Sequence, residues 1–236
     1  MSAPLLSVRR LCAYYGRAQI LFDVDLEIAP GEVVALMGRN GAGKSTTMKA
    51  IMGLVERRGR VEFDGRDLAG LEPYRISRLG LGWVPEDRRI FTDLSVRENL
   101  EVGRQPARKG AYTWSVERLF ALFPNLGEMP ERPGGRMSGG EQQMLSVART
   151  LMGNPRLVLL DEPSEGVAPL IVEQMAAMIV ELKSHGLGVL LSEQNLAFAA
   201  AVSDRAYVLE KGQVRFAGTM AELDADEAIR RQTLTI

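Results

Sequence analysis

The chain has 236 residues, of which 46% are hydrophobic and 25% are charged, proportions that are usual for a globular protein. At about 150 residues per domain, this length predicts one large domain or two small ones. Twenty-nine basic and thirty acidic residues leave a net charge of −1, which argues against a broad nucleic-acid-binding surface. No apolar run reaches the roughly 18 residues of a membrane-spanning helix. The segment from Met1 to Pro4 is not typical of a secretory signal.

The counts of cysteine and histidine limit the possible chemistry. The single cysteine, Cys12, excludes an internal disulfide and a cysteine-rich zinc site. The single histidine, His185, leaves little room for a histidine-based metal site. It lies between a helical pattern and an apolar run, in the turn Lys183-Ser184-His185-Gly186. We therefore expect His185 to be a solvated residue at a helix C-terminus.

The first part of the chain predicts short strands around one helix. Leu6 to Leu11 and Val24 to Ile28 have the pattern of antiparallel strands, and Ala29 to Glu32 has the pattern of a turn. The apolar, β-branched run from Glu32 to Met37 predicts a buried strand. A short helix is expected over Lys44 to Leu54, where apolar residues recur at helical spacing.

The middle of the chain changes from strands to helices. Arg60 to Phe63 and Leu81 to Val84 predict two further strands. From about residue 87 to residue 155 the pattern is helical, without evident strands. The candidate helices are Ser95 to Gly103, Ser115 to Phe123 and Ser138 to Met152.

The last part alternates strands and helices again. Leu157 to Leu160 and Gly188 to Leu191 predict buried strands, and Val172 to Lys183 between them predicts a helix. This order predicts a parallel sheet with right-handed crossovers. We therefore expect an α/β fold with a mainly parallel core sheet, an N-terminal antiparallel β region and a helical insertion. One domain would span residues 1–236, with a core at about 1–86 and 156–236 and a helical subdomain at about 87–155.

A phosphate-binding loop is predicted between the buried strand and the first helix. The eight residues from Gly38 to Ser45 fit the pattern G-x-x-x-x-G-K-[ST] in the strand-to-helix context that the pattern requires. Backbone N–H groups and the helix N-terminus would hold phosphate oxygens. Lys44 would reach the β- and γ-phosphates, and the Ser45 hydroxyl would coordinate Mg²⁺. The alternative is a glycine-rich turn with an accidental lysine, which leaves the coincidence of motif and context unexplained.

An acidic pair follows another predicted strand. Asp161, at the end of Leu157 to Leu160, would hold Mg²⁺, and Glu162 would polarise an attacking water as a general base. On its own, such a pair is usually a helix cap or a solvated turn. Together with the loop, it predicts a phosphoryl-transfer site. A kinase, a GTPase and a helicase would all fit these two motifs.

The stretch from Met137 to Gln143 resembles the signature motif of ABC ATPases, in which S-G-G-x-Q opens a helix. Ser138 is expected to cap this helix, and its glycines let backbone N–H groups approach an anion. The resemblance implies that these residues contact the ATP of a partner subunit, so that two subunits enclose two ATP molecules. The alternative is a capped surface helix. The expected signature residues are Ser138, Gly139, Gly140, Glu141 and Gln142.

Other segments follow the order of the ABC family over roughly residues 5–223. Tyr15 occupies the place of the aromatic residue that stacks on adenine, although core packing would also explain it. Ser164 to Ala168 corresponds to the D-loop, which usually ends in aspartate where this chain has Ala168. The residues that the resemblance assigns to the chain's own ATP are Tyr15, Gly38, Arg39, Asn40, Gly41, Ala42, Gly43, Lys44, Ser45 and Thr46.

Two positions depart from the family pattern. Glu86 stands where the family has its Q-loop glutamine, and Gln194 stands where it has its switch histidine. Gln194 can donate a hydrogen bond to the γ-phosphate but cannot carry the charge of an imidazolium. The expected catalytic residues are thus Glu162, Lys44 and Gln194, and the expected Mg²⁺ ligands are Ser45, Asp161 and Glu86.

Three short patterns resemble one branch of the family: P-E-x-R-R-x-F at 85–91, D-E-P-S-x-G-x-A-P at 161–169 and E-Q-N at 193–195. The chain is similar to the second ATPase subunit (LivF type) of importers for branched-chain and other hydrophobic amino acids, and to the related ATPases of urea and short-amide importers. The resemblance implies a bacterial or archaeal protein at the cytoplasmic face of the membrane. Its partners would be two permeases, a second ABC ATPase and a solute-binding protein.

The resemblance also places the permease contact at about residues 87–100. There Ile90 and Phe91 would be apolar anchors and Arg88 and Arg89 polar ones, although Ile90 and Phe91 could also pack inside the helical insertion. Two other functions remain as alternatives. A non-transport ABC ATPase is opposed by the lack of heptad coiled coils and of a second ATPase half, and a small-molecule kinase leaves Ser138 to Gln142 unexplained.

Overall fold

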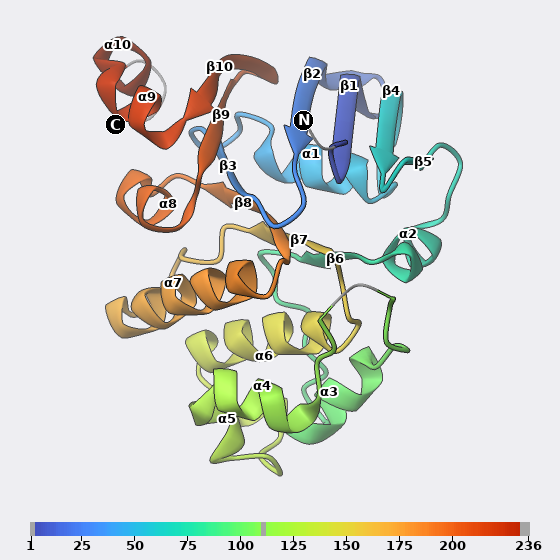
Figure 1. The fold of residues 1–236 in the computed structure, drawn as a ribbon, viewed down its shortest axis with the longest axis vertical. Coiled ribbons are helices and arrows are strands. Elements are labelled where there is room, and N and C mark those ends of the chain that lie inside the picture. Colours follow the sequence, from blue (N-terminus) through green and yellow to red (C-terminus); the bar gives the residue numbers. More distant parts are fainter. Residues whose placement is uncertain (1–2, 110–111, 232–236) are drawn as a thin grey trace.

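The computed structural model describes residues 3–109 and 112–231, and Figure 1 shows its two sheets and the helices around them. The smaller sheet is antiparallel and has the order β2-β1-β4-β5. Its strands are β1 (Leu6–Tyr15), β2 (Ala18–Ile28), β4 (Glu56–Phe63) and β5 (Arg66–Asp67). The predicted antiparallel region is confirmed, but β1 and β2 are longer than predicted. They continue into a hairpin in which Tyr15 pairs with Ala18.

The larger sheet has six strands in the order β10-β9-β3-β8-β7-β6. These are β3 (Val33–Met37), β6 (Leu81–Val84), β7 (Leu157–Asp161), β8 (Gly188–Glu193), β9 (Arg205–Glu210) and β10 (Gln213–Thr219). All neighbours pair in parallel except β9 and β10. The mainly parallel sheet is therefore confirmed, whereas β9 and β10 add an antiparallel edge that was not predicted.

Helix α1 (Lys44–Ile51) lies between the two sheets (Figure 1). Its buried Met48 and Ile51 share one hydrophobic cluster with Leu21 of β2 and Leu36 of β3. Burial of a side chain of this size contributes about 1.5–3 kcal/mol. The smaller sheet therefore packs through α1 against one face of the larger sheet.

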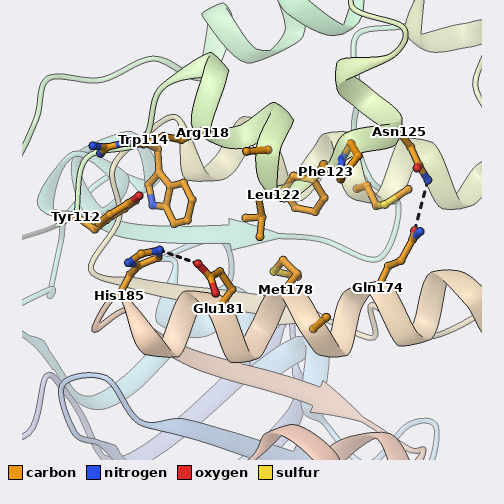
Figure 2. A pocket seen from close by; sticks show the side chains of 14 residues that line it. Tyr112, Trp114, Arg118, Leu122, Phe123, Asn125, Gln174, Met178, Glu181 and His185 are labelled. Atoms are coloured by element: carbon orange, nitrogen blue, oxygen red, sulfur yellow. Dashed lines mark hydrogen bonds and ion pairs between the residues drawn. The ribbon is translucent and has the colours of Figure 1, made fainter.

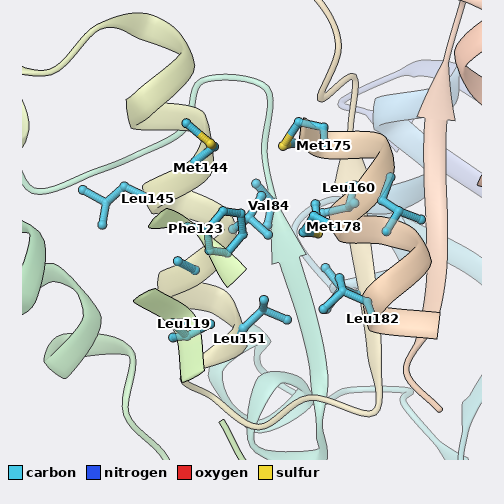
Figure 3. Close-up of a cluster of buried hydrophobic side chains, with 14 of the residues drawn as sticks. Val84, Leu119, Phe123, Met144, Leu145, Leu151, Leu160, Met175, Met178 and Leu182 are labelled. Carbon is cyan, nitrogen blue, oxygen red and sulfur yellow. The ribbon is translucent and has the colours of Figure 1, made fainter. Parts of the chain in front are cut away.

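Helices dominate residues 87–155, and the described part of this range contributes no strand to either sheet. The helices are α3 (Val96–Gly103), α4 (Val116–Leu122), α5 (Pro124–Gly127), the short η1 (Gly134–Arg136) and α6 (Gly139–Leu151). Helix α7 (Pro169–Ser184) packs against them. Figure 3 shows Met144 of α6 facing Met175 of α7, with Phe123 beside them. One continuous core thus joins the helical region to the larger sheet.

Four further helices complete the described part of the fold. Helices α2 (Pro73–Leu79) and α8 (Leu196–Val202) were not predicted, and α9 (Met220–Ala225) and α10 (Glu227–Ile229) follow β10. No helix in the described ranges is long and apolar enough to cross a membrane. The prediction for the N-terminal segment falls partly on residues 1–2, which lie outside the described residues.

The expectation for His185 is partly wrong. The residue is the C-cap of α7, as expected, but its side chain is only 28% exposed. Its ring stacks on Tyr112 at a centroid distance of 3.8 Å, and its Nε2 lies 3.0 Å from Glu181. Tyr112 belongs to the segment before α4, more than seventy positions away in the chain. Local sequence around His185 therefore holds no sign of this contact.

Candidate active site

The carboxyl ends of β3, β7 and β8 form the edge on which the site is built. In the parallel register Asp161 pairs with Ser192, and Met37 pairs with Glu193. Each strand is followed at once by a predicted site residue, so residues far apart in the chain meet here. This edge is the usual place for ligands in an open parallel sheet.

The phosphate loop depends on glycine where its backbone turns. Gly38 has φ 150° and Gly43 has φ 111°, a left-handed conformation that side chains rarely adopt. A Cβ at Gly38 would lie 2.5 Å from the Leu209 carbonyl oxygen, and one at Gly43 would lie 2.7 Å from Leu21. The loop is therefore pressed against β9 and β2. Gly43 is also the N-cap of α1, so the helix begins with free N–H groups at the loop.

Lys44 is 3% exposed, and its ammonium group is held inside the loop. Its Nζ donates hydrogen bonds to the carbonyl oxygens of Gly38 at 2.8 Å and Arg39 at 3.2 Å. It also lies 3.0 Å from Oε1 of Glu162, whose side chain is 7% exposed. A buried charge needs such partners. The structure thus pairs the expected phosphate-binding lysine with the expected general base.

The backbone at Glu162 is unusual. Its φ of 47° is left-handed, and its N–H group donates to Oγ of Ser192 at 3.0 Å. The other carboxylate oxygen accepts a hydrogen bond from Nε2 of Gln194 at 3.1 Å. Burial raises the pKa of Glu162, but hydrogen bonds from Glu165, Lys44 and Gln194 and the charge of Lys44 outweigh it, so the pKa lies below its ordinary value. Glu162 is therefore held as a carboxylate.

Oxygen ligands for a divalent cation converge at Asp161. Its Oδ1 accepts hydrogen bonds from Ser45 Oγ at 3.0 Å and from Ser192 Oγ at 2.7 Å. Burial raises the pKa of Asp161, and the two serine hydrogen bonds oppose this rise. A hydroxyl and a carboxylate are the ligands that Mg²⁺ takes beside phosphate oxygens. Glu86 is exposed and lines the same cavity as Ser45. These residues fit Mg²⁺.

The cavity beside the loop has a volume of about 460 Å³, within the usual range for ligand sites. Tyr15 lines it and is 46% exposed, so packing in the core does not explain this residue. The predicted residues that line the cavity are Tyr15, Asn40, Gly41, Gly43, Lys44, Ser45, Thr46, Glu86 and Glu162. Gly38, Arg39 and Ala42 belong to the loop but do not line this cavity, and of these three Arg39 is exposed. Gln194 is connected to the cavity through Asn40, whose Oδ1 accepts from Gln194 Nε2 at 2.8 Å.

The signature residues lie elsewhere in the molecule. Ser138 caps α6 as predicted, since its Oγ accepts a hydrogen bond from Glu141 N at 3.3 Å and Glu141 Oε2 accepts one from Ser138 N at 2.6 Å. Gln142 donates to the carbonyl oxygen of Gly134. Of the described residues around the 460 Å³ cavity, none comes from Ser138 to Gln142. Within one chain, the structure does not bring the signature to the phosphate loop.

Three residues without a predicted role belong to the site. Ser192 bridges Asp161 and Glu162, as described above. Glu193 is 2% exposed and accepts hydrogen bonds from the N–H groups of Ser164, Gln194 and Asn195, which tie the D-loop to the Gln194 segment. Burial raises the pKa of Glu193 despite these bonds. Glu165 shares a hydrogen bond with Glu162, which raises the pKa of Glu165 to about 7. The polar S-E-Q-N run after an apolar strand was the available signal.

The four residues predicted at the permease contact differ in their placement. Phe91 is 47% exposed, whereas Ile90 packs against the hydrophobic core, as the alternative expectation had it. The guanidinium of Arg88 lies at Gly139, where a Cβ would come within 2.8 Å of its Nη1. Arg89 lies over the ring of Trp83. Arg88 and Ile90 are thus half-buried, whereas Arg89 and Phe91 are exposed.

Comparisons with known proteins identify the family of the chain. A family model described as ABC transporter matches residues 21–165. The chain is 43% identical to the high-affinity branched-chain amino acid transport ATP-binding protein BraG of Pseudomonas aeruginosa, over 96% of this chain and 97% of that protein. It is 35% identical to the probable branched-chain amino acid transport ATP-binding protein LivF of Archaeoglobus fulgidus, over 98% and 99%. Identity to the lipopolysaccharide export system ATP-binding protein LptB of Escherichia coli is 34%, over 96% and 95%.

Solved structures have the same fold. An ATP-binding cassette of an ABC transporter in its ADP conformation superposes with a TM-score of 0.82 at 26% identity, covering 98% of each chain. An ATP-binding subunit of another ABC transporter gives 0.81 at 32% identity, covering 98% of this chain and 96% of the other.

Proposed function

Because this chain belongs to the ATP-binding proteins of the ABC transporter family, we propose that it hydrolyses ATP to drive import of branched-chain or other hydrophobic amino acids. The observation that carries this proposal is the 43% identity to BraG over nearly the whole of both chains, which exceeds the 34% identity to LptB. The three short patterns of the amino-acid branch support it. Urea or short amides are related possible solutes.

The chain would work as one ATP-binding domain, residues 1–236. In this proposal residues 1–86 and 156–236 form the catalytic core, and residues 87–155 form the helical subdomain that carries the signature. The continuous core between α6 and α7 supports a single unit. In one chain the signature residues do not line the cavity beside the phosphate loop. This supports an arrangement in which the signature of each subunit completes the ATP site of its partner.

ATP would bind with its phosphates in the loop from Gly38 to Ser45 and its adenine against Tyr15. Lys44 would exchange its carbonyl and Glu162 partners for phosphate oxygens, which frees the Glu162 carboxylate to accept a proton from water. Gln194, held between Asn40 and Glu162, would donate its amide N–H to the γ-phosphate or the attacking water. Ser45 and Asp161, with Glu86 at the cavity wall, would hold Mg²⁺, which neutralises phosphate charge when bound.

The signature helix would complete the site of a second ATPase subunit. Ser138, Gly139 and Gly140 lie at the capped N-terminus of α6, where free N–H groups and the helix dipole attract an anion. A heterodimer with a different ABC ATPase is expected. Because Gln194 replaces the histidine of the family pattern, the two ATP sites of such a heterodimer would differ chemically.

A shallow cavity of about 350 Å³ is the proposed seat of a permease segment. Phe91 and Val102 give it exposed apolar surface. The guanidinium of Arg149 lies 5.1 Å from the Phe91 ring, and that of Arg89 lies 5.3 Å from the Trp83 ring. Exposed aromatic residues beside arginines are typical of the centre of a binding surface. Bound to two permeases, which receive the solute from a solute-binding protein, the chain would work at the cytoplasmic face of the membrane.

The proposal is tested by purifying the tagged chain from detergent-solubilised membranes of its own cells. Two hydrophobic permease chains and a second ATPase are expected to co-purify. After reconstitution with the system's solute-binding protein, ATP should drive uptake of labelled leucine. Uptake of urea and not of leucine would assign the chain to the ATPases of urea importers. Co-purification of a lipopolysaccharide-export permease would contradict the proposal.

A further inference from the structure

Another cavity, of about 560 Å³, lies between the helical region and α7, away from the phosphate loop. Figure 2 shows that it is elongated, with different side chains at its two ends. One end is formed by Tyr112, Trp114, Glu181 and His185, the other by Asn125 and Gln174, and the middle by Leu122, Phe123 and Met178. None of these residues has a role in the proposed ATP site.

The middle part of the cavity is lined by buried apolar side chains. Phe123 is 3% exposed and Met178 is 1% exposed, and both belong to the core that joins α4, α6 and α7. At one end of the cavity, Asn125 Nδ2 lies 3.5 Å from Gln174 Oε1, so this end is closed by neutral amides. A preformed cavity with apolar walls and few polar groups is the usual form of a small-molecule site.

The other end combines aromatic rings with one carboxylate. Tyr112 stacks on His185, and Trp114 meets Tyr112 edge to face at 4.8 Å. Among the described residues that line the cavity, Glu181 is the one acidic side chain. One of its oxygens pairs with His185, and its side chain is 52% exposed. Aromatic faces beside a carboxylate attract an organic cation.

Among the described residues that line the cavity, Arg118 is the one arginine or lysine, and its guanidinium is already engaged. It lies 4.8 Å from the centroid of Tyr112 and donates to the Thr113 carbonyl oxygen. In Figure 2 Tyr112 lies between Arg118 and His185. Glu181 therefore presents the available charge at this end.

We propose that this cavity binds a hydrophobic amine, whose ring or branched hydrocarbon body lies against Leu122, Phe123 and Met178 while its ammonium group pairs with Glu181. The ligand joins α4 and α5 to α7. Helix α6, which also reaches the cavity through Met144, begins at the signature, and α7 begins directly after the D-loop. Occupancy therefore ties the helical region to the part of the chain that carries Glu162. The inference does not depend on the identity of the transported solute.

Tryptamine is a suitable probe, with indole-3-propionate as a control that has the same ring system and the opposite charge. We expect saturable binding of one tryptamine per chain in isothermal titration calorimetry, performed with saturating ADP so that the adenine site is filled. Indole-3-propionate should bind at least about fivefold more weakly, because Glu181 repels it. Equal binding of the two compounds, or no saturable binding of tryptamine, overturns the proposal.

Variants on α7 locate the binding site. Ala177 lines the cavity from an exposed position, so Ala177→Trp should fill it and abolish tryptamine binding. Val180→Trp, at a 54% exposed position of the same helix outside the cavity lining, should bind as the wild type does. Glu181→Gln should weaken tryptamine about threefold to tenfold and leave indole-3-propionate no weaker than before. Unchanged tryptamine binding by Ala177→Trp contradicts the proposal, and unchanged ADP binding shows that each variant is folded.

Discussion

At the scale of single residues, the Glu162 carboxylate is shared by three side chains. Lys44 pairs with one oxygen, Gln194 donates to the other, and Glu165 shares a hydrogen bond with the same group. Two carboxyl groups in contact retain one proton between them, and the pKa of Glu165 is accordingly raised to about 7. Below about pH 7, down to the pH at which Glu162 itself titrates, the base is thus ionised while its neighbour carries the proton.

A pH effect on stability follows from Glu165. A carboxyl whose folded-state pKa lies above its unfolded value contributes stability below the unfolded pKa, and this contribution is lost as the pH rises through the folded pKa. For Glu165 the loss falls between about pH 4.5 and pH 7. Glu162, whose pKa is lowered, titrates below this window. In the absence of nucleotide, the fall in the thermal unfolding midpoint from pH 5 to pH 8 should therefore be smaller for Glu165→Gln than for the wild type. Parallel curves for the two proteins would contradict the shared proton.

Gln194 is expected to orient the groups around the γ-phosphate. Its amide bridges Asn40 and Glu162, so Gln194→Ala removes two hydrogen bonds from the site. We expect ATP turnover in the assembled transporter to fall about tenfold, a loss typical of one modest interaction made in the transition state. Gln194→His is the matched control and should retain turnover. If Gln194→Ala leaves both ATP turnover and uptake unchanged, the residue is structural only.

Sequence predicted the chemistry of these residues better than their contacts. The loop, Asp161 and Glu162 are contiguous motifs, and the structure places them at one edge of the sheet. The contacts of Ser192 and Glu193 depend on the position of β8 beside β7. The local sequence pattern does not show which strands become neighbours, so these contacts were not predicted. The stacking of His185 on Tyr112 was unpredictable for the same reason.

At the scale of elements, the side chain of Asn154 connects the segment before α4 to the end of α6 through hydrogen bonds. Its side chain is buried, accepts from Trp114 N at 2.8 Å and donates to the Gln105 carbonyl oxygen at 2.9 Å. Asn154→Ala leaves both backbone groups without this partner, so we expect a loss of about 2–4 kcal/mol of unfolding free energy. Urea unfolding measures it.

Asn154→Gly distinguishes the loss of the side-chain hydrogen bonds from the strain of the backbone at this position. Asn154 has φ 50°, a conformation that glycine adopts freely and alanine does not. Both variants lose the side-chain hydrogen bonds, and the alanine variant should be the less stable of the two. If Asn154→Ala unfolded at the same urea concentration as the wild type, other contacts, such as those of Arg108, would hold the segment.

The elements that sequence missed are of two kinds. β9 and β10 form the antiparallel edge of an otherwise parallel sheet, and α2 and α8 have only seven residues each. Short helices take most of their stability from tertiary packing and have little periodicity of their own. In contrast, α6 and α7 are long, and their predicted positions were confirmed to within a few residues.

At the scale of the whole molecule, the cavity beside the phosphate loop and the proposed permease contact around Phe91 have no lining residue in common, so separate substitutions can test them. Phe91→Ala should weaken association with the permeases at least about tenfold, as loss of an aromatic anchor does. The ATP binding of the isolated chain should not change. Leu54→Ala, at a 42% exposed position far along the chain from residues 87–100, is the matched control. Unchanged association of Phe91→Ala would remove Phe91 from the contact surface.

The most direct test of the whole account compares the wild type with Glu162→Gln in the reconstituted transporter. ATP binding, ATP turnover and leucine uptake are measured on the same preparation. We expect ATP binding to persist and turnover and uptake to fall on the order of 10²-fold or more, because the variant retains the loop but loses the base. Near-normal turnover with intact uptake would contradict the assignment of Glu162, and with it the proposed use of this site to drive transport.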